Sequence, residues 1–294
     1  MRYVLRHTTT YTYDAVVTDS LGVAHLVPPT LPGQQVTSYA VEVAPAPSDT
    51  STDLDHHGNL VTWFQVTEPH TELVVEGRGE VEVTAPVVDP VADARPWESL
   101  RPLAVGGEPS EPASPEVVEM ALASPAVPRD DGATAYAAGS FAVGRPVGEV
   151  VDDLVHRVHR DFLYDPTATT VTSTVREVVE RRSGVCQDFA HLLLACLRGH
   201  GLAARYVSGY LATEPPPGHD RVVGADASHA WVEVWLGGTT WRAVDPTNDV
   251  RVTDRHVTVA RGRDYGDVAP LKGVIVTEAS RSTMTVSVDV APVA

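Results

Sequence analysis

Three residues in the second half of the chain have the types needed for nucleophilic attack on a carbonyl carbon. Cys186 opens the apolar stretch CQDFAHLLLACL, which predicts a helix with the cysteine in its first turn, and Gly184 leaves room for a substrate beside the sulfur. The unpaired N–H groups and partial positive charge of a helix N-terminus stabilise a thiolate. Such a nucleophile needs a base and a group that orients the base. His229 and Asp245 follow in the chain and could fill these two roles.

Two consecutive strands are expected to bring the histidine and the aspartate together. The segment SHAWVEVWL alternates as a strand does, so His229 and Trp231 lie on the same face. The next strand, TTWRAVDPT, aligns Trp241 with Asp245, and a hairpin through GGTT would place Asp245 beside His229. Pro246 favours an extended conformation for Asp245 at the strand end. Trp231 would then shield a His–Asp ion pair from water.

Each of these residues also has an ordinary structural explanation. His229 could be a solvated strand histidine, and Asp245 a turn aspartate before proline. The second cysteine, Cys196, lies among leucines further along the same segment and is expected to be buried and structural. A helix that holds both cysteines separates them by about 15 Å, which is too far for a disulfide and suits a reducing compartment.

Neighbouring polar groups are expected to support or frame the reactive sulfur. The backbone N–H of the cysteine is placed to donate to an oxyanion. Gln187 either assists there or satisfies local backbone groups, and Asp188 either caps the helix or holds a neighbouring loop. Tyr210 either lines the cleft or fills the core. The loop TEPPPGHD, from Thr213 to Asp220, is either a cleft rim or a solvated connection.

The composition divides the chain into three parts. Residues 1–85 carry short alternating segments between turn residues, which is typical of a small antiparallel β-sandwich. Residues 86–114 have the proline and alanine content of a linker, with Trp97 and Leu100 available to pin it to a surface. From 115 to 294, helical periods precede a run of strands that ends in a final pair. This last part is interpreted as a catalytic core with C-terminal strands, and the fold class as α+β.

The stretch DLDHHGNL in the first part contains two adjacent histidines, which are common metal ligands. Gly58 and Asn59 suit the positive φ angles of a tight turn between two strands. Adjacent side chains usually point apart, so His56 and His57 are expected to serve the turn rather than share a metal ion. The twelve histidines show no HExxH or comparable spacing, and there is no EF-hand loop. The sequence therefore predicts neither a metal nor another cofactor.

Charge and hydropathy limit the class of partner. The net charge of −17 repels nucleic acid and anionic membrane surfaces. No apolar run approaches the roughly 20 residues of a membrane span. The start MRYVLRHTTTYTYD has no apolar region like that of a secretory signal, so a cytoplasmic location is expected.

Several motifs together resemble one family. The stretches GVCQDFAH, RYVSGYL, SHAWVEVWL and AVDPTND resemble the core motifs of the transglutaminase-like superfamily of bacterial cysteine enzymes. The later GRDYGDVAPLKG and the N-terminal strands around DHHGNLVTWF are similar to its two-domain members. The resemblance implies a papain-like fold with a Cys–His–Asp triad. Cys186, His229 and Asp245 would then be nucleophile, base and orienter.

The resemblance leaves the reaction open, because the superfamily includes amide hydrolases, cross-linking acyltransferases and inactive relatives. The intact triad favours a thiol enzyme that acts through a thioester over a silent binding module or a metal-dependent hydrolase. Lys272 is the only lysine, which disfavours self-cross-linking. Hydrolysis of a carboxamide, peptide or isopeptide bond in a peptide or protein substrate is therefore expected, with protein-glutamine amine acyltransfer as the alternative.

Overall fold

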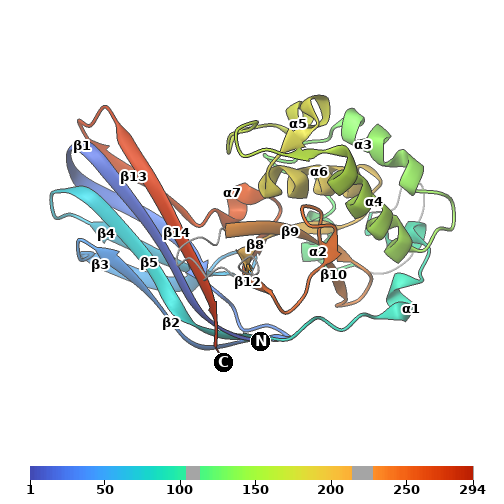
Figure 1. The fold of residues 1–294 in the computed structure, drawn as a ribbon, viewed down its shortest axis with the longest axis horizontal. Helices are drawn as coiled ribbons and strands as arrows, with labels where there is room; N and C mark the ends of the chain where they lie inside the picture. Colours follow the sequence, from blue (N-terminus) through green and yellow to red (C-terminus); the bar gives the residue numbers. More distant parts are fainter. Residues whose placement is uncertain (104–112, 214–227, 294) are drawn as a thin grey trace, which may run out of the picture.

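The computed structural model describes residues 1–103, 113–213 and 228–293. Figure 1 shows a long antiparallel sheet beside a second, smaller sheet that is covered by helices. The expected combination of a mixed α/β core with an N-terminal antiparallel sheet is confirmed. Within the described ranges, no helix is both long and apolar enough to cross a bilayer.

The long sheet is organised around its first strand, β1 (Arg2–Val27). One half of β1 pairs with β5 (His70–Val83) and β14 (Ser282–Pro292), and the other half pairs with β4 (Leu60–Val66) and β13 (Leu271–Thr277). The outer strands are β2 (Gln34–Ala44) on β5 and β3 (Asp49–Leu54) on β4. Strand β1 thus carries the sheet through a bend.

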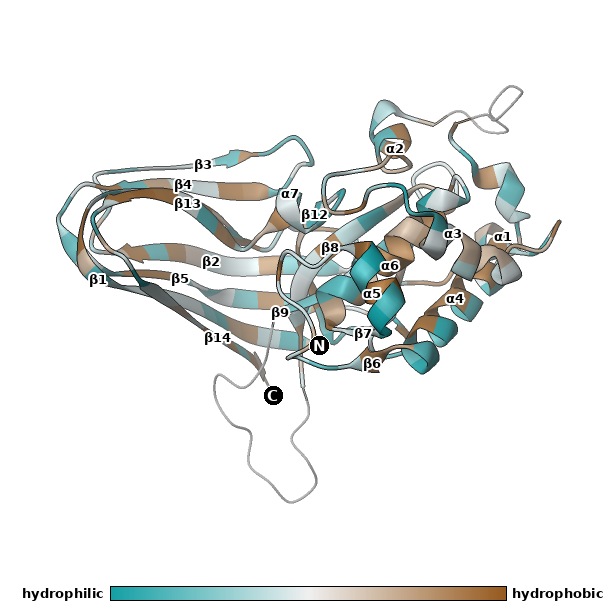
Figure 2. Cartoon of the chain, turned by 90° about the horizontal axis from the view of Figure 1, so that it is seen from above, coloured by the Kyte–Doolittle hydropathy of each residue, from teal (hydrophilic) through white to brown (hydrophobic). Residues whose placement is uncertain are grey.

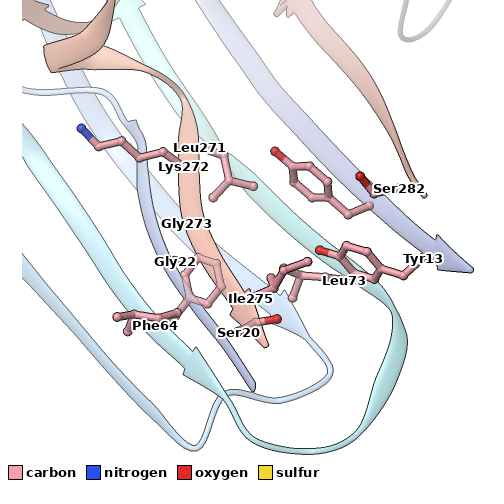
Figure 3. Close-up of a pocket in the computed structure, with 12 residues that line it drawn as sticks. Tyr13, Ser20, Gly22, Phe64, Leu73, Leu271, Lys272, Gly273, Ile275 and Ser282 are labelled. Atoms are coloured by element: carbon pink, nitrogen blue, oxygen red, sulfur yellow. The ribbon is translucent and has the colours of Figure 1, made fainter. Parts of the chain in front are cut away.

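The two halves of this bent sheet pack against each other as the layers of a sandwich do. Val17, Leu26, Phe64 and Val75, from both halves, share one buried cluster. A Cβ on Gly77 of β5 would lie 3.3 Å from the Cβ of Leu26, which shows how closely the layers approach. A cavity of about 150 Å³ remains between the two halves, lined by β1 residues from both sides of the bend and by residues of β13 and β14 (Figure 3).

The final strand pair corrects the expected domain boundary. Residues 271–292 were expected to belong with the catalytic core, but β13 and β14 complete the N-terminal sheet. The reason is the length of β1, whose 26 residues offer pairing edges that the strands up to residue 83 do not fill. The N-terminal sheet is also not separate, because Tyr3 and Leu5 share a buried cluster with Val257 and Val259 of the smaller sheet.

The smaller sheet has the strand order β11-β10-β9-β8-β12. These strands are β8 (Ala204–Leu211), β9 (Ser228–Trp235), β10 (Trp241–Asp245), β11 (Val250–Arg251) and β12 (His256–Gly262). One face is covered by α3 (Asp131–Ala137), α4 (Val147–Asp161), α5 (Val175–Arg181) and α6 (Cys186–Gly199), whose apolar sides form the main core. The outward sides of α4 and α5 are largely hydrophilic (Figure 2). Short elements complete this part: α2 (Pro115–Glu119), η2 (Ala138–Ser140), β6 (Leu163–Tyr164), β7 (Ser183–Gly184) and α7 (Tyr265–Val268).

The segment expected to be a linker is partly built into the core. It contains α1 (Pro90–Asp93) and the 3₁₀ helix η1 (Trp97–Leu100). Leu100 is fully buried, and the indole of Trp97 donates a hydrogen bond to the carbonyl of Ala142. The part of this segment around Ala92, Trp97 and Leu100 therefore packs into the main core, since its large apolar side chains outweigh the linker-like composition around them. Residues 104–112 lie outside the described ranges.

Two buried amide side chains join the two sheets. Gln34 donates to the carbonyl of Thr258 and accepts from its N–H, at 2.8 Å each. Asn59 does the same with the backbone of Arg261, at 2.8 and 2.7 Å. Gly58 has the expected positive φ of 78°, whereas the side chain of Asn59 docks the turn onto β12. These bonds satisfy backbone groups at the junction.

We predict that Gln34→Ala lowers the free energy of unfolding by about 1–3 kcal/mol, because it leaves the buried N–H and carbonyl of Thr258 without partners. The matched control is Gln35→Ala, whose exposed side chain bonds only a neighbouring carbonyl, and it should change stability by less than about 0.5 kcal/mol. Urea denaturation would measure both. Equal effects from the two variants would contradict a role for this amide in docking the sheets.

Candidate active site

Helix α6 begins at Cys186, as the sequence predicted. Asp188, which is 2% exposed, accepts hydrogen bonds from the N–H of Val185 at 2.9 Å and from the hydroxyl of Thr169 at 2.6 Å. The expected structural role of Asp188, capping the helix and holding a loop, is confirmed. A Cβ on Gly184 would lie 2.8 Å from the Asp188 side chain, so the space beside this glycine is occupied by the cap rather than kept for a substrate.

The hairpin that was expected to join His229 and Asp245 is present. Strand β10 pairs antiparallel with β9, and Gly237 and Gly238 take positive φ in the connection. Val244 lies opposite Val232, which puts the next residue, Asp245, at the end of β10 on the side of His229. Nε2 of His229 lies 2.7 Å from Oδ2 of Asp245.

The imidazole of His229 interacts with two acidic groups at once. Burial disfavours the protonated ring, but hydrogen bonds to Asp245 and to Cys186, together with the charge of both groups, raise the pKa of His229 to about 10. Because Nε2 contacts Asp245, Nδ1 is the ring nitrogen left for the sulfur. Asp245 therefore holds the ring of His229 through a hydrogen bond, and Cys186 lies close enough to the ring to contribute to its raised pKa.

Asp245 has no solvent exposure and is surrounded by donors. Oδ1 accepts from the N–H groups of Thr247 and Asn248, and Oδ2 accepts from the side-chain amide of Asn248 at 2.7 Å. Nε2 of His256 lies 3.2 Å from the same Oδ2. Burial alone would raise the pKa of Asp245, but the hydrogen bonds from His229, His256 and Asn248 hold it well below its usual range.

Trp231 covers this group from one side, as expected from its place in β9. It is fully buried, and its ring centroid lies 6.2 Å from that of His229 and 5.3 Å from that of His256. A Cβ on Gly209 of β8 would lie 2.4 Å from the Trp231 ring, so the indole fits only because residue 209 is a glycine. The tryptophan thus limits the access of water to the ion pair.

The chain matches known proteins along most of its length. Residues 3–82 match the family described as the bacterial transglutaminase-like N-terminal region, and residues 135–246 match the transglutaminase-like superfamily. An uncharacterized protein of Mycobacterium tuberculosis is 44% identical over 298 residues, which cover 99% of this chain and 93% of that protein. The chain belongs to the transglutaminase-like superfamily. It is thereby a member of a thiol-dependent enzyme family.

Two further likenesses concern the superfamily's fold and one of its activities. The solved structure of a candidate cysteine protease from Cytophaga hutchinsonii has a TM-score of 0.73 at 18% identity, covering 98% of this chain and 90% of that one, which shows the fold. A protein-glutamine gamma-glutamyltransferase of Pseudomonas aeruginosa is 37% identical over 95 residues, which are 31% of this chain and 14% of that protein.

The remaining residues expected at the site bond to groups other than His229 and Asp245. The side-chain amide of Gln187 donates to the carbonyl of Val171 at 3.2 Å, which matches the local alternative. The hydroxyl of Tyr210 lies 3.0 Å from Nδ1 of His7, and its ring is buried at the junction of the two sheets, so it fills the core there. Of the expected rim loop from Thr213 to Asp220, all but the first residue lies outside the described ranges.

Sequence reasoning missed His256 as a partner of Asp245. It begins β12, which pairs with β8 rather than with either strand of the histidine hairpin. One side-chain N or O atom from each of His229, Asp245 and His256 lies within 4.8 Å of the other two, so the three polar groups form one compact cluster. Asn248 could have been noticed, since it lies in the motif AVDPTND beside Asp245. Its position three residues after Asp245 did not by itself indicate a function.

We predict that Asp245→Asn lowers the pKa of His229 from about 10, because the amide keeps the hydrogen-bonding reach but removes the negative charge that favours the imidazolium. NMR titration of the His229 ring would measure the shift. Asp249→Asn, the same change a few residues along the loop, pairs with His156 instead and should leave the titration of His229 in place. An unchanged titration in Asp245→Asn would refute the proposed coupling.

Proposed function

We propose that this protein is a thiol-dependent acyl-transfer enzyme that hydrolyses amide bonds through a Cys186 thioester. The observation that carries the proposal is that His229 hydrogen-bonds the buried Asp245 at 2.7 Å, and that Asp245 and Cys186 together raise the pKa of His229 to about 10. A protonated imidazole near a cysteine at a helix N-terminus is the kind of environment in which thiol enzymes activate their nucleophile. The substrate is expected to be a peptide or protein with a carboxamide, peptide or isopeptide bond.

Acylation uses Cys186 as nucleophile and His229 as acid. The thiolate of Cys186 attacks the carbonyl carbon and a C–S bond forms. The oxygen that becomes negative can be stabilised by N–H groups at the start of α6. The imidazolium of His229 gives its proton to the nitrogen as the C–N bond breaks, so ammonia or an amine leaves and a thioester remains.

Deacylation reverses the role of His229. The ring, now neutral, takes a proton from water as the water oxygen bonds to the thioester carbon. The C–S bond then breaks, the carboxylic acid is released and the thiolate–imidazolium pair is restored. Throughout, Asp245 keeps the ring oriented and stabilises its charged form, which is the part an orienting carboxylate has in such triads.

Amine transfer is the second candidate, and the local identity to a protein-glutamine gamma-glutamyltransferase supports it. The two reactions share the thioester and differ only in whether water or an amine resolves it. Mass spectrometry of a glutamine-containing peptide library, incubated with and without a primary amine, would separate them. If the enzyme hydrolyses amide bonds, the same products form with and without the amine. If it transfers the acyl group, amine adducts form. The absence of both kinds of product would refute both candidates.

We predict that Cys186→Ala abolishes thioester formation, as measured by intact mass after reaction with an activated ester. Cys196→Ser is the matched control. Cys196 is fully buried and its sulfur contacts the carbonyl of Ala133, and burial raises the pKa of its thiol to about 12. This variant should acylate nearly as fast as the wild type and lose only some stability. Acylation of Cys186→Ala, with a dead Cys196→Ser, would show that the nucleophile is misassigned.

We predict that His256 is a positioning residue whose replacement by alanine lowers kcat/KM about tenfold or more. The loss of a hydrogen bond to a buried carboxylate costs about 1.5–3 kcal/mol. His256→Gln keeps an N–H donor and should restore part of the activity. The pH profile should also shift in the alanine variant, because Asp245 would orient His229 less firmly. A purely structural role would leave that profile unchanged and show no rescue by glutamine.

A further inference from the structure

A second cluster of metal-type ligands lies away from Cys186, at the junction of the two sheets. The side chains of His56 and His57 were expected to point apart, but their ring centroids are 4.9 Å apart in an edge-to-face arrangement. A ligand atom from each of them and from Glu119 all lie within 4.8 Å of one another. Glu119 ends α2, so the cluster joins two parts of the chain that are remote in sequence.

The turn that carries the two histidines is held firmly. Oδ1 of Asp55 accepts from the N–H groups of His57 and Asn59, both at 2.8 Å, and Gly58 has a φ of 78°. Asn59 in turn is fixed to Arg261, as described above. A ligand set on such a turn is pre-organised, because little backbone freedom remains to be lost when an ion binds.

The distances suit a small divalent cation. Nε2 of His56 lies 2.8 Å from Oε2 of Glu119. Zinc binds such atoms at about 2.0–2.2 Å, so two of its ligand atoms stand roughly 3 Å apart. Nε2 of His57 lies 3.1 Å from Oδ2 of Asp267, an interaction that orients the ring, and carboxylates commonly hold metal-binding histidines in this way.

The charges around the cluster favour a cation on balance. Three carboxylates are present, those of Asp55, Glu119 and Asp267, against two cations. One cation is Arg263, which is paired with both oxygens of Asp267 at 2.9 Å and lies 3.7 Å from Glu119. The other is Lys272, which donates to the carbonyl of Gly266. A cavity of about 440 Å³, lined by both histidines, gives water access to the cluster.

We propose that His56, His57 and Glu119 bind a divalent transition-metal ion of the zinc type, which fastens the N-terminal sheet to α2. Two imidazoles and one carboxylate are a ligand set that zinc accepts while a water fills the fourth position. The ion would replace the direct contact of His56 with Glu119 by two coordination bonds. The ion would tie the turn of His56 and His57 to α2, and its ligands do not include Cys186, His229 or Asp245.

The test uses Cys186→Ala as the parent protein, so that the thiol cannot take the metal. Metal-free protein would be titrated with ZnCl₂ by calorimetry and with Co²⁺ by visible absorption. One ion should bind per chain, and zinc should raise Tm. His56→Ala and Glu119→Gln should each weaken binding at least about tenfold. The side chain of His56 is 72% exposed, so His56→Ala should keep the Tm of the metal-free parent.

Two further variants locate the ion. His156 is also exposed, at 59%, and faces one carboxylate, Asp249, at 2.9 Å, so His156→Ala should bind zinc as the parent does. His229→Ala should also bind zinc unchanged, which separates the site from the group around Asp245. The proposal is overturned if the parent binds no more tightly than about 1 mM, or if binding survives His56→Ala and Glu119→Gln.

Discussion

A carboxylate without solvent contact is the constraint around which the region of His229 and His256 is arranged. Asp245 can remain ionised in the interior only because backbone and side-chain donors reach both of its oxygens. An unpaired charge in that position would cost several kcal/mol. The donors come from β9, from the loop after β10 and from β12. Those three segments must therefore assemble before the anion is stable, and the charge on His229 depends on that assembly.

A second buried carboxylate on β9, that of Glu233, also needs partners to stay ionised. Glu233 is 5% exposed. Its Oε2 accepts a hydrogen bond from Nε of Arg205 at 2.6 Å, and its Oε1 accepts one from Nη2 of Arg261 at 2.8 Å. Although burial opposes ionisation, these two cations lower the pKa of Glu233. Arg261 also uses its backbone to hold Asn59 of the N-terminal sheet. Buried polar groups thus form a continuous connection from the strand that carries His229 to the other sheet.

What the sequence could predict depended on how far apart the partners are in the chain. Cys186 at a helix start and the hairpin of His229 and Asp245 follow from local patterns, and the structure confirms both elements. The contact of His256 with Asp245 depends on β12 lying beside β8, which no periodicity encodes. Glu119 meets the two adjacent histidines only after both sheets are packed. The pairing of β13 and β14 with β1 could not be predicted for the same reason, because the alternation of apolar and polar residues identifies a strand but not the strand it pairs with.

Strand β1 imposes an order on the folding of this protein. In each half, one edge of β1 pairs with β5 or β4, which are synthesised soon after it, while the opposite edge waits for β14 or β13. The ribosome makes those last strands only after the smaller sheet and all its helices. An open strand edge is a template for pairing with other chains, so the nascent N-terminal sheet is exposed to aggregation throughout that interval. A chain cut short after β12 would keep Cys186, His229 and Asp245 but would aggregate through the unpaired edge of β1.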